Sequence, residues 1–255
     1  MTSTPSTTPR HSYWRVTHAP RYSLLFALPL LVFYEILAAT LPLAGGGAEW
    51  RNGADVLLRA PFLALLGPRG PLVFEAGLIA VGLWLVVRDR RAHGAALRWS
   101  WFLALLGEAL LLALLLGVVA GGLTSSLLRP LERLAVPFIG LQGQTPGTLA
   151  LFTLSLGAGL YEELLFRVML VASLAYGARA LLGWRPWVAG ATAVLLGAAL
   201  FSAFHYVGPY GDRLELYSFV YRMIGGLFFS ALYLLRGFGV TAWTHALYDV
   251  LVLAL

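Results

Sequence analysis

The chain has 255 residues, of which 59% are hydrophobic and only 12% are charged, and its mean hydropathy is +0.79. Soluble globular domains carry about 25% charged residues, so this composition excludes an ordinary soluble protein and predicts a membrane protein in contact with lipid. The net charge of +6 comes from eighteen arginines, most of which lie just outside the apolar runs, so it indicates membrane topology and predicts no nucleic-acid partner.

A polar tail over residues 1–21, rich in Ser, Thr, Pro and Arg, is the first segment that the sequence predicts. Apolar runs follow, each near the ~20 residues that a helix needs to cross a bilayer. Because lipid offers no partner for a free backbone amide, such runs must be helices. The sequence therefore predicts an all-α polytopic membrane helix bundle of about seven transmembrane helices, over 22–43, 71–87, 100–122, 147–171, 187–207, 215–235 and 238–255.

Two further segments, 54–67 and 126–141, mix leucines with charged residues at helical spacing, although prolines interrupt both. They predict one or two interfacial helices, and the alternative is a loop helix that packs on the protein itself. Polar residues inside apolar runs concentrate after residue 147. The chain therefore divides into a variable N-terminal transmembrane region, 22–146, and a four-helix core, 147–255, which we expect to hold any site.

The arginines are distributed unequally between the two sides of the predicted bundle. With the loops assigned alternately, ten arginines lie on the side of the N-terminus and six on the other side. Since the side richer in arginine faces the cytoplasm, we expect a cytoplasmic N-terminus. The abundance of Leu, Ala, Gly and Arg without any lysine is typical of a GC-rich bacterial genome, which favours the inner membrane of a bacterium.

Six ionisable side chains lie within the later apolar runs: Glu162, Glu163, Arg167, His205, His245 and Asp249. An unpaired charge at the bilayer centre costs about 2.5–3.5 kcal/mol, so six of them left alone would offset the ~5–15 kcal/mol of a domain's stability. They must face each other or water. We therefore expect three helices to converge on one polar cavity inside the membrane.

The spacing of these residues suggests pairs. Glu163 and Arg167 are four residues apart with the acid first, which favours an ion pair on one helix face. Glu162 points about 100° away from Glu163 around the helix and stays free for another partner. His245 and Asp249 also share a face. One acid with two histidines is a set of residues found in hydrolytic centres and in metal sites. Four other ionisable residues in or beside the runs predict interhelical pairing or a position near a membrane interface, with proton relay as the alternative: Glu35, Glu75, Glu108 and Arg222.

Three motifs in the later part of the chain carry a resemblance to a known family. "EELLFR" matches E-E-x-x-x-R, "FSAFH" matches F-x-x-x-H, and "HALYD" matches H-x-x-x-N/D. In this order, each on its own predicted helix, they resemble the CPBP family of intramembrane proteases, which includes the type II CAAX prenyl proteases and bacterial Abi proteins. The resemblance covers roughly residues 147–255.

The resemblance implies a role for each motif residue. Glu162 would be the general base that activates water, with His205 holding that water. His245 and Asp249 would bind the substrate carbonyl and stabilise the oxyanion, or complete a metal site. An aspartate donates to an oxyanion only when it is protonated, whereas the prenyl-protease branch often has asparagine at this place. The supporting residues would be Glu163 and Arg167, as a structural pair, and Phe201, as packing.

Two mechanisms are open, one with a metal ion and one without. Glu162, His205 and His245 could ligate Zn²⁺ as two histidines and one carboxylate. The alternative is a glutamate-based hydrolase without metal, which the sequence favours slightly because the local H-E-x-x-H arrangement is missing.

The function that the residues predict is an intramembrane endopeptidase that cuts a membrane-associated protein near its C-terminus or anchor. Its partners would be membrane lipid and a membrane-anchored protein or peptide substrate. A non-enzymatic membrane immunity or scaffold protein that keeps the protease fold is the alternative. A proton-coupled transporter ranks last, because the sequence contains no recognisable inverted repeat.

Overall fold

The structure is a computed structural model that describes residues 13–45, 50–93, 97–129, 147–208 and 211–254. Every regular element within these ranges is a helix, which confirms the predicted all-α class. The elements in chain order are α1 (Tyr13–Thr17), α2 (Pro20–Gly45), α3 (Gly53–Leu66), η1 (Gly67–Arg69), α4 (Gly70–His93), α5 (Trp99–Leu128), α6 (Thr148–Gly157), η3 (Ala158–Glu162), η4 (Leu164–Val171), α7 (Ala172–Leu182), α8 (Pro186–Phe204), α9 (Leu216–Arg236) and α10 (Phe238–Ala254).

Six helical stretches of the described chain are long and apolar enough to cross a membrane: Pro20–Pro42, Gly53–His93, Trp99–Leu128, Thr148–Leu182, Pro186–Phe204 and Leu216–Arg236. They cover the first six predicted spans. The seventh apolar run forms α10, whose 17 described residues are fewer than the ~20 that usually span a bilayer. The bundle therefore has the predicted polytopic character, with α10 as a shorter last helix.

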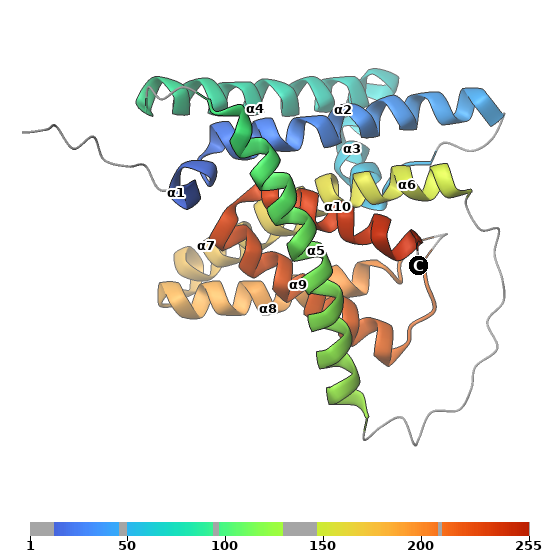
Figure 1. Cartoon of the computed structure of the whole chain (residues 1–255), viewed down its shortest axis with the longest axis vertical. Coiled ribbons are helices and arrows are strands. Elements are labelled where there is room, and N and C mark those ends of the chain that lie inside the picture. The colour runs from blue at the N-terminus through green and yellow to red at the C-terminus, as the bar shows by residue number, and fades with distance from the viewer. Residues whose placement is uncertain (1–12, 46–49, 94–96, 130–146, 209–210, 255) are drawn as a thin grey trace, which may run out of the picture.

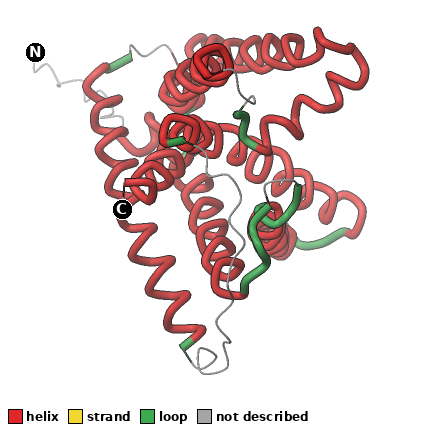
Figure 2. Tube along the Cα trace, turned by 90° about the vertical axis from the view of Figure 1, so that its right-hand side faces the viewer, coloured by secondary structure: helices red, strands yellow, loops and turns green. Residues whose placement is uncertain are grey.

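Helix α10 lies in the middle of the bundle. It packs against α2, α5, α6, α9 and η3. Figure 1 shows α2 and α4 side by side along one edge of the molecule, with α10 below them and α8 and α9 farther down. Leu30 of α2, Leu160 of η3 and Ala246 of α10 belong to one buried apolar cluster. The long helix α5 runs obliquely past this core and reaches farthest at the bottom of both views (Figures 1 and 2).

The two predicted interfacial segments have different outcomes. The segment 54–67 forms α3, which packs on α4 and on η3. This agrees with the alternative prediction, a helix that packs on the protein itself. Its charged face points inward, because Arg59 is buried while Leu65 is 83% exposed. In the segment 126–141, the first three residues finish α5, and residues 130–141 lie outside the described residues.

Part of the polar tail predicted over residues 1–21 is helical in the structure. Residues 1–12 lie outside the described residues, but α1 and the first residues of α2 occupy the second half of this segment. Arg236 at the end of α9 donates to the Thr17 hydroxyl over 3.0 Å and also pairs with Glu108 of α5. A buried arginine from a distant helix therefore orders residues whose composition alone is typical of a disordered tail.

The continuous helix Thr148–Leu182, which carries the first predicted motif, is not a regular α-helix. Over Ala158–Glu162 and Leu164–Val171 it is π-helical, with hydrogen bonds that reach five residues along the chain. Such wide turns change the direction of side chains and occur often at functional sites. They flank Glu163, so both glutamates of the motif lie in the distorted stretch.

Candidate active site

Close packing between η3 and α10 brings the first and third motifs together. A Cβ atom at Gly159 would lie 2.4 Å from the backbone oxygen of Ala242 and 2.7 Å from the side chain of Ala246. The two helix backbones therefore touch at this point, as small residues allow in membrane bundles. Since Glu162 follows Gly159 by three residues and His245 adjoins Ala246, both side chains lie beside this contact.

Glu162 is the point on which the three motifs converge. Its side chain is 7% exposed, and its Oε2 atom lies 4.0 Å from Nε2 of His205 and 4.0 Å from Nε2 of His245. This oxygen has no hydrogen-bond partner among the described residues. The structure thus brings the carboxylate and the two histidines together from η3, the end of α8 and α10, as the sequence predicts for three converging helices.

Each histidine is held through its other ring nitrogen. Nδ1 of His205 lies 2.9 Å from the backbone oxygen of Phe201, one turn earlier in α8. Nδ1 of His245 lies 2.7 Å from Oε1 of Glu163. Because both acceptors are oxygens, each Nδ1 carries the proton of that hydrogen bond. The Nε2 edge of both rings is therefore the edge that faces Glu162.

The predicted ion pair between Glu163 and Arg167 is present and fully buried. Nε of Arg167 lies 3.2 Å from Oε2 of Glu163, and the two side chains are 2% and 0% exposed. The guanidinium lies 4.4 Å from the ring centroid of Phe201, a cation–π contact. Glu163 also has a second partner, because its other oxygen accepts a hydrogen bond from His245. The two neighbouring glutamates therefore serve the same imidazole, one at each ring nitrogen.

Asp249 lies at the more open side of the site. Its Oδ2 atom is 3.7 Å from Nε2 of His245, and its side chain is 30% exposed. The predicted i, i+4 relation of these two residues on α10 therefore places the aspartate near the nitrogen that also faces Glu162.

Aromatic rings enclose the histidines. Phe201 packs edge-on against His205 with 5.1 Å between centroids, which fits the packing role expected for this motif residue. Phe229 of α9 stacks on His245 with 4.3 Å between centroids and 24° between planes. Sequence reasoning missed Phe229, because it is one of several phenylalanines in an apolar run and no motif marks it. Its exposed fraction of 2% shows that it closes the site from the α9 side.

A comparison with known families covers the same part of the chain. Residues 144–251 match the family model described as type II CAAX prenyl endopeptidase Rce1-like. These residues form an Rce1-like domain. The match confirms the resemblance to the CPBP and CAAX protease family, and it indicates a protease. No curated protein and no solved structure matches the chain. Together with the apolar helices, the Rce1-like domain identifies an integral membrane protein.

One residue outside the boundaries of the Rce1-like domain contacts Glu162, and sequence reasoning also missed this contact. Asn52, just before α3, donates from Nδ2 to Oε1 of Glu162 over 2.8 Å. An asparagine in front of "GAD" is a readable N-cap signal. Its contact with a residue 110 positions later is not readable from the pattern, because it depends on how α3 packs on η3.

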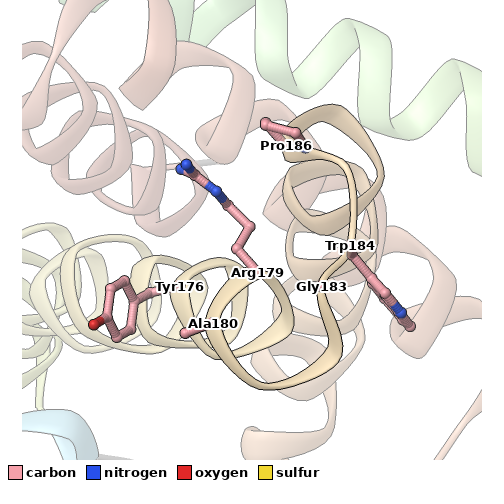
Figure 3. A pocket seen from close by; sticks show the side chains of 6 residues that line it. All are labelled: Tyr176, Arg179, Ala180, Gly183, Trp184 and Pro186. Atoms are coloured by element: carbon pink, nitrogen blue, oxygen red, sulfur yellow. The ribbon is translucent and has the colours of Figure 1, made fainter.

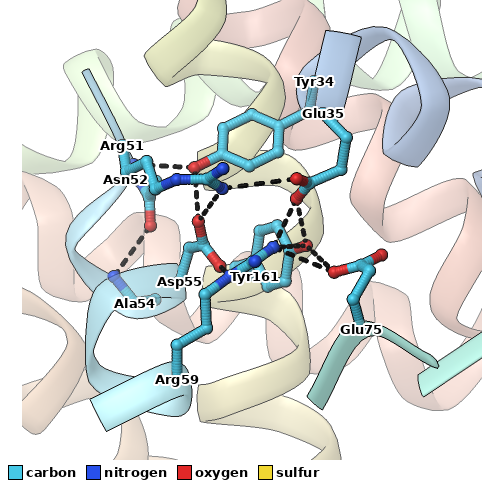
Figure 4. Close-up of polar contacts among 9 residues, drawn as sticks. All are labelled: Tyr34, Glu35, Arg51, Asn52, Ala54, Asp55, Arg59, Glu75 and Tyr161. Atoms are coloured by element: carbon cyan, nitrogen blue, oxygen red, sulfur yellow. Dashed lines mark hydrogen bonds and ion pairs between the residues drawn. The ribbon is translucent and has the colours of Figure 1, made fainter. Parts of the chain in front are cut away.

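A charged network joins the N-terminal helices to the residue next to Glu162. The Tyr161 hydroxyl lies 2.8 Å from Glu35 and 3.1 Å from Glu75, and Arg59 pairs with both carboxylates (Figure 4). Arg51 adds a second cation at 3.3 Å from Glu35. These contacts confirm the interhelical pairing predicted for the two glutamates. Of the other two residues in that prediction, Glu108 pairs with Arg236 and Arg222 pairs with Asp212, which precedes α9.

Two hollows of the molecule lie apart from the candidate site. One, of about 460 Å³, lies between the end of α7 and the start of α8 and is lined by Tyr176, Arg179, Ala180, Gly183, Trp184 and Pro186 (Figure 3). The other, of about 540 Å³, is a mainly apolar groove between α2, α4 and the π-helical stretch. No predicted site residue lines either hollow, so the candidate site consists of the converging side chains themselves.

The distances between these side chains can be compared with those between the ligands of a zinc ion. Within the described ranges, no group of three His, Cys, Asp or Glu residues is arranged to hold a metal ion. Both histidine Nε2 atoms lie 4.0 Å from Glu162 Oε2, whereas two donors of a tetrahedral zinc site lie roughly 3.4 Å apart. At this spacing the three residues do not match the tetrahedral arrangement that the zinc alternative requires.

Proposed function

We propose that this protein is an intramembrane endopeptidase in which Glu162 and His205 activate water to hydrolyse a peptide bond of a membrane-associated protein. The observation that carries the proposal is the buried Oε2 atom of Glu162, which has no hydrogen-bond partner among the described residues and faces two imidazole nitrogens. A separation of 4.0 Å is too long for a direct hydrogen bond and suits a bridging water.

The two acceptors give the water a defined orientation. One water proton would point to Oε2 of Glu162 and the other to Nε2 of His205, whose Nδ1 proton already binds the backbone oxygen of Phe201. The water oxygen would attack the substrate carbonyl carbon while Glu162 takes one proton. When the carbon–nitrogen bond breaks, Glu162 would return that proton to the leaving amine, so a single carboxyl group serves as base and then as acid.

His245 is the group we propose for the developing oxyanion. Its Nδ1 proton binds Glu163, and its Nε2 lies near Glu162 and Asp249, so three carboxyl groups surround this imidazole. An imidazolium Nε2–H can donate to the oxyanion. Asp249 as a carboxylate cannot donate, so in this scheme it supports the charge on His245 instead of binding the carbonyl itself.

The mechanism we propose needs no metal. The support for this choice is the spacing of the Glu162 and histidine atoms, which suits a bridging water better than a tetrahedral ion. Metal analysis of the purified protein, with the peptidase rate measured before and after chelation, tests it. We expect the rate to survive chelation, and a loss that Zn²⁺ alone restores would overturn the metal-free mechanism.

The substrate class we propose is a membrane-anchored protein or peptide that is cut near its C-terminus or anchor. The name of the matched family, a CAAX prenyl endopeptidase, supports a bond close to a lipid-attached C-terminus. The arginine distribution supports a cytoplasmic N-terminus, and the abundance of Leu, Ala, Gly and Arg without any lysine supports a bacterial inner membrane. Comparison of the membrane-anchored proteins of a deletion strain with those of the parent strain would identify the substrate by its uncut form.

The central test replaces the proposed base. The purified protein in lipid nanodiscs is assayed with an internally quenched peptide that ends in a prenylated CAAX sequence. We expect Glu162→Gln to lower kcat by ~10²-fold or more, because it keeps the shape but cannot accept the water proton. We expect a similar loss for His205→Ala. Glu108→Gln serves as the control, because it weakens a buried pair of α5 and α9 far from the motifs.

The same variant separates the enzyme from its non-enzymatic alternative. If Glu162→Gln cleaves the peptide at the wild-type rate, the proposed mechanism is wrong. If it restores the phenotype of the deletion strain as fully as the wild-type gene does, catalysis is unnecessary and an immunity or scaffold role is favoured. We expect neither outcome.

A further inference from the structure

Asn52 is a buried residue of the N-terminal region that touches the proposed general base. Its Nδ2 atom donates to Oε1 of Glu162 over 2.8 Å, and both residues are 6% exposed. We infer that Asn52 is a positioning residue: it occupies one carboxylate oxygen of Glu162 and directs the other toward the two histidines. The inference rests on the proposed function, because the positioned group is the proposed base.

The orientation of the Asn52 amide is determined by its two neighbours. Asn52 is the N-cap of α3, and its side-chain oxygen accepts from the Ala54 backbone N–H over 2.8 Å. A flipped amide would place an NH₂ group against an N–H and an oxygen against the Glu162 carboxylate, so both contacts would become repulsive. The helix cap therefore forces the NH₂ group to point at Glu162.

The backbone of Asn52 is held as firmly as its side chain. Its N–H donates to the Tyr34 hydroxyl over 3.0 Å, and that hydroxyl donates to Asp55 over 2.8 Å (Figure 4). Tyr34 and Asp55 are both fully buried. The donor that meets Glu162 is therefore attached to α2 and α3 together, and it does not depend on a flexible loop side chain.

The helix Thr148–Leu182, which carries Glu162, approaches Asn52 at Gly157, a residue that has no side chain. A Cβ atom at Gly157 would lie 2.7 Å from Cβ of Asn52 and 2.5 Å from Cε2 of Tyr34. The glycine, five residues before Glu162, lets the helix of the Rce1-like domain rest directly on the start of α3. The contact between Asn52 and Glu162 therefore lies beside a point where the side chains of Asn52 and Tyr34 pack directly on the backbone at Gly157.

The chemical consequence concerns the last torsion of Glu162. A glutamate carboxylate rotates about its terminal bond in a broad, roughly two-fold well, so burial alone does not fix the angle of the carboxylate plane. A donor held at one oxygen restrains this angle, so that the other oxygen faces the histidines and is left for the water. Misplacement of a reacting group by about 1 Å can cost ~10²-fold in rate.

The test separates positioning from helix capping. Serine caps a helix about as well as asparagine but is too short to reach Glu162, so Asn52→Ser keeps the cap and removes the donor. We expect kcat to fall about 10- to 100-fold with KM unchanged and with thermal unfolding near wild type. Asn52→Asp keeps both the cap and the shape. Its activity should recover as the pH falls, because only a protonated carboxyl can restore the donor.

A second readout needs no substrate. The infrared band of the Glu162 carboxylate is assigned from the difference between wild type and Glu162→Gln, and loss of a hydrogen bond at one oxygen should shift it in Asn52→Ser. An unshifted band, or a wild-type kcat for Asn52→Ser while Glu162→Gln is inactive, overturns the inference and leaves the proposed function intact. Full activity of Glu162→Gln would instead overturn the proposed function, and the infrared band would still decide whether Asn52 positions Glu162.

Discussion

At the scale of single residues, the candidate site is a balance of buried charges. Arg167 is the cation that compensates Glu163, and its guanidinium also lies over the Phe201 ring. Glu163 in turn holds His245 through its other oxygen. A change at Arg167 should therefore reach the imidazole of His245 through Glu163.

Removal of the cation tests this balance. Arg167→Met leaves the Glu163 carboxylate buried without its partner, and we expect the free energy of unfolding to fall by about 3–5 kcal/mol. The double variant Glu163→Gln with Arg167→Met removes both charges and should lose less than the sum of the single losses. Denaturant unfolding of the purified variants in detergent measures the cycle. Strictly additive losses would show that the two charges do not compensate each other.

At the scale of helices, the site depends on glycines that let neighbouring helices approach closely. The helix Thr148–Leu182 meets the backbone of α10 at Gly159, and a Cβ at Gly197 of α8 would lie 2.5 Å from the Val171 side chain. These contacts determine how close the histidines come to Glu162, because each histidine lies within a few turns of the contact on its own helix. The small residues of the apolar runs are therefore part of the construction of the site.

A methyl group at the first contact should separate the helices. In Gly159→Ala the new Cβ would lie 2.4 Å from a backbone oxygen of α10, so η3 or α10 must shift. Overpacking of this kind costs typically 1–3 kcal/mol, and we expect lower thermal stability together with a lower kcat. Gly177→Ala is the matched control, since nothing lies within 4 Å of its new Cβ and alanine is the better helix former. Equal behaviour of the two variants would contradict the role of the contact.

At the scale of the whole molecule, the N-terminal region is part of the site's construction. Helix α10, which carries His245, packs between α2 and α5 from the N-terminal side. Asn52 reaches Glu162, and the network of Arg59, Glu35 and Glu75 reaches Tyr161. The predicted division into 22–146 and 147–255 therefore describes where the motifs lie along the chain, whereas the two parts share one interior.

Separate expression of the two parts tests this dependence. A fragment of residues 147–255 would expose the face of α10 that α2 and α5 cover and would lack Asn52, so we expect it to be unstable and inactive. Co-expression with a fragment of residues 1–146 should restore peptidase activity and yield a complex that purifies together, as membrane helices often reassociate through packed faces. Full activity of the C-terminal fragment alone would show that its interior does not need the first half.

The sequence by itself determined the features that are local in the chain. Runs of apolar residues near 20 in length predict helices, because an unpaired backbone amide is costly in lipid, and six of the runs are helices of that kind. The three motifs in their order carried the resemblance that the family model supports, because each motif is defined by a short spacing within one helix. Even the pairing of Glu163 with Arg167 follows from four residues on one helix.

Only the tertiary structure decided which distant residues complete the site. Asn52 and Glu162 are 110 residues apart, and Phe229 is one of three phenylalanines in its apolar run. Hydropathy and spacing assign such residues to elements, but a contact between elements depends on the angle and depth at which helices pack. The wide π turns beside Glu163, the backbone contact at Gly159 and the side chains that pack on Gly157 set that geometry. They determine how Glu162, Asn52 and the two histidines meet.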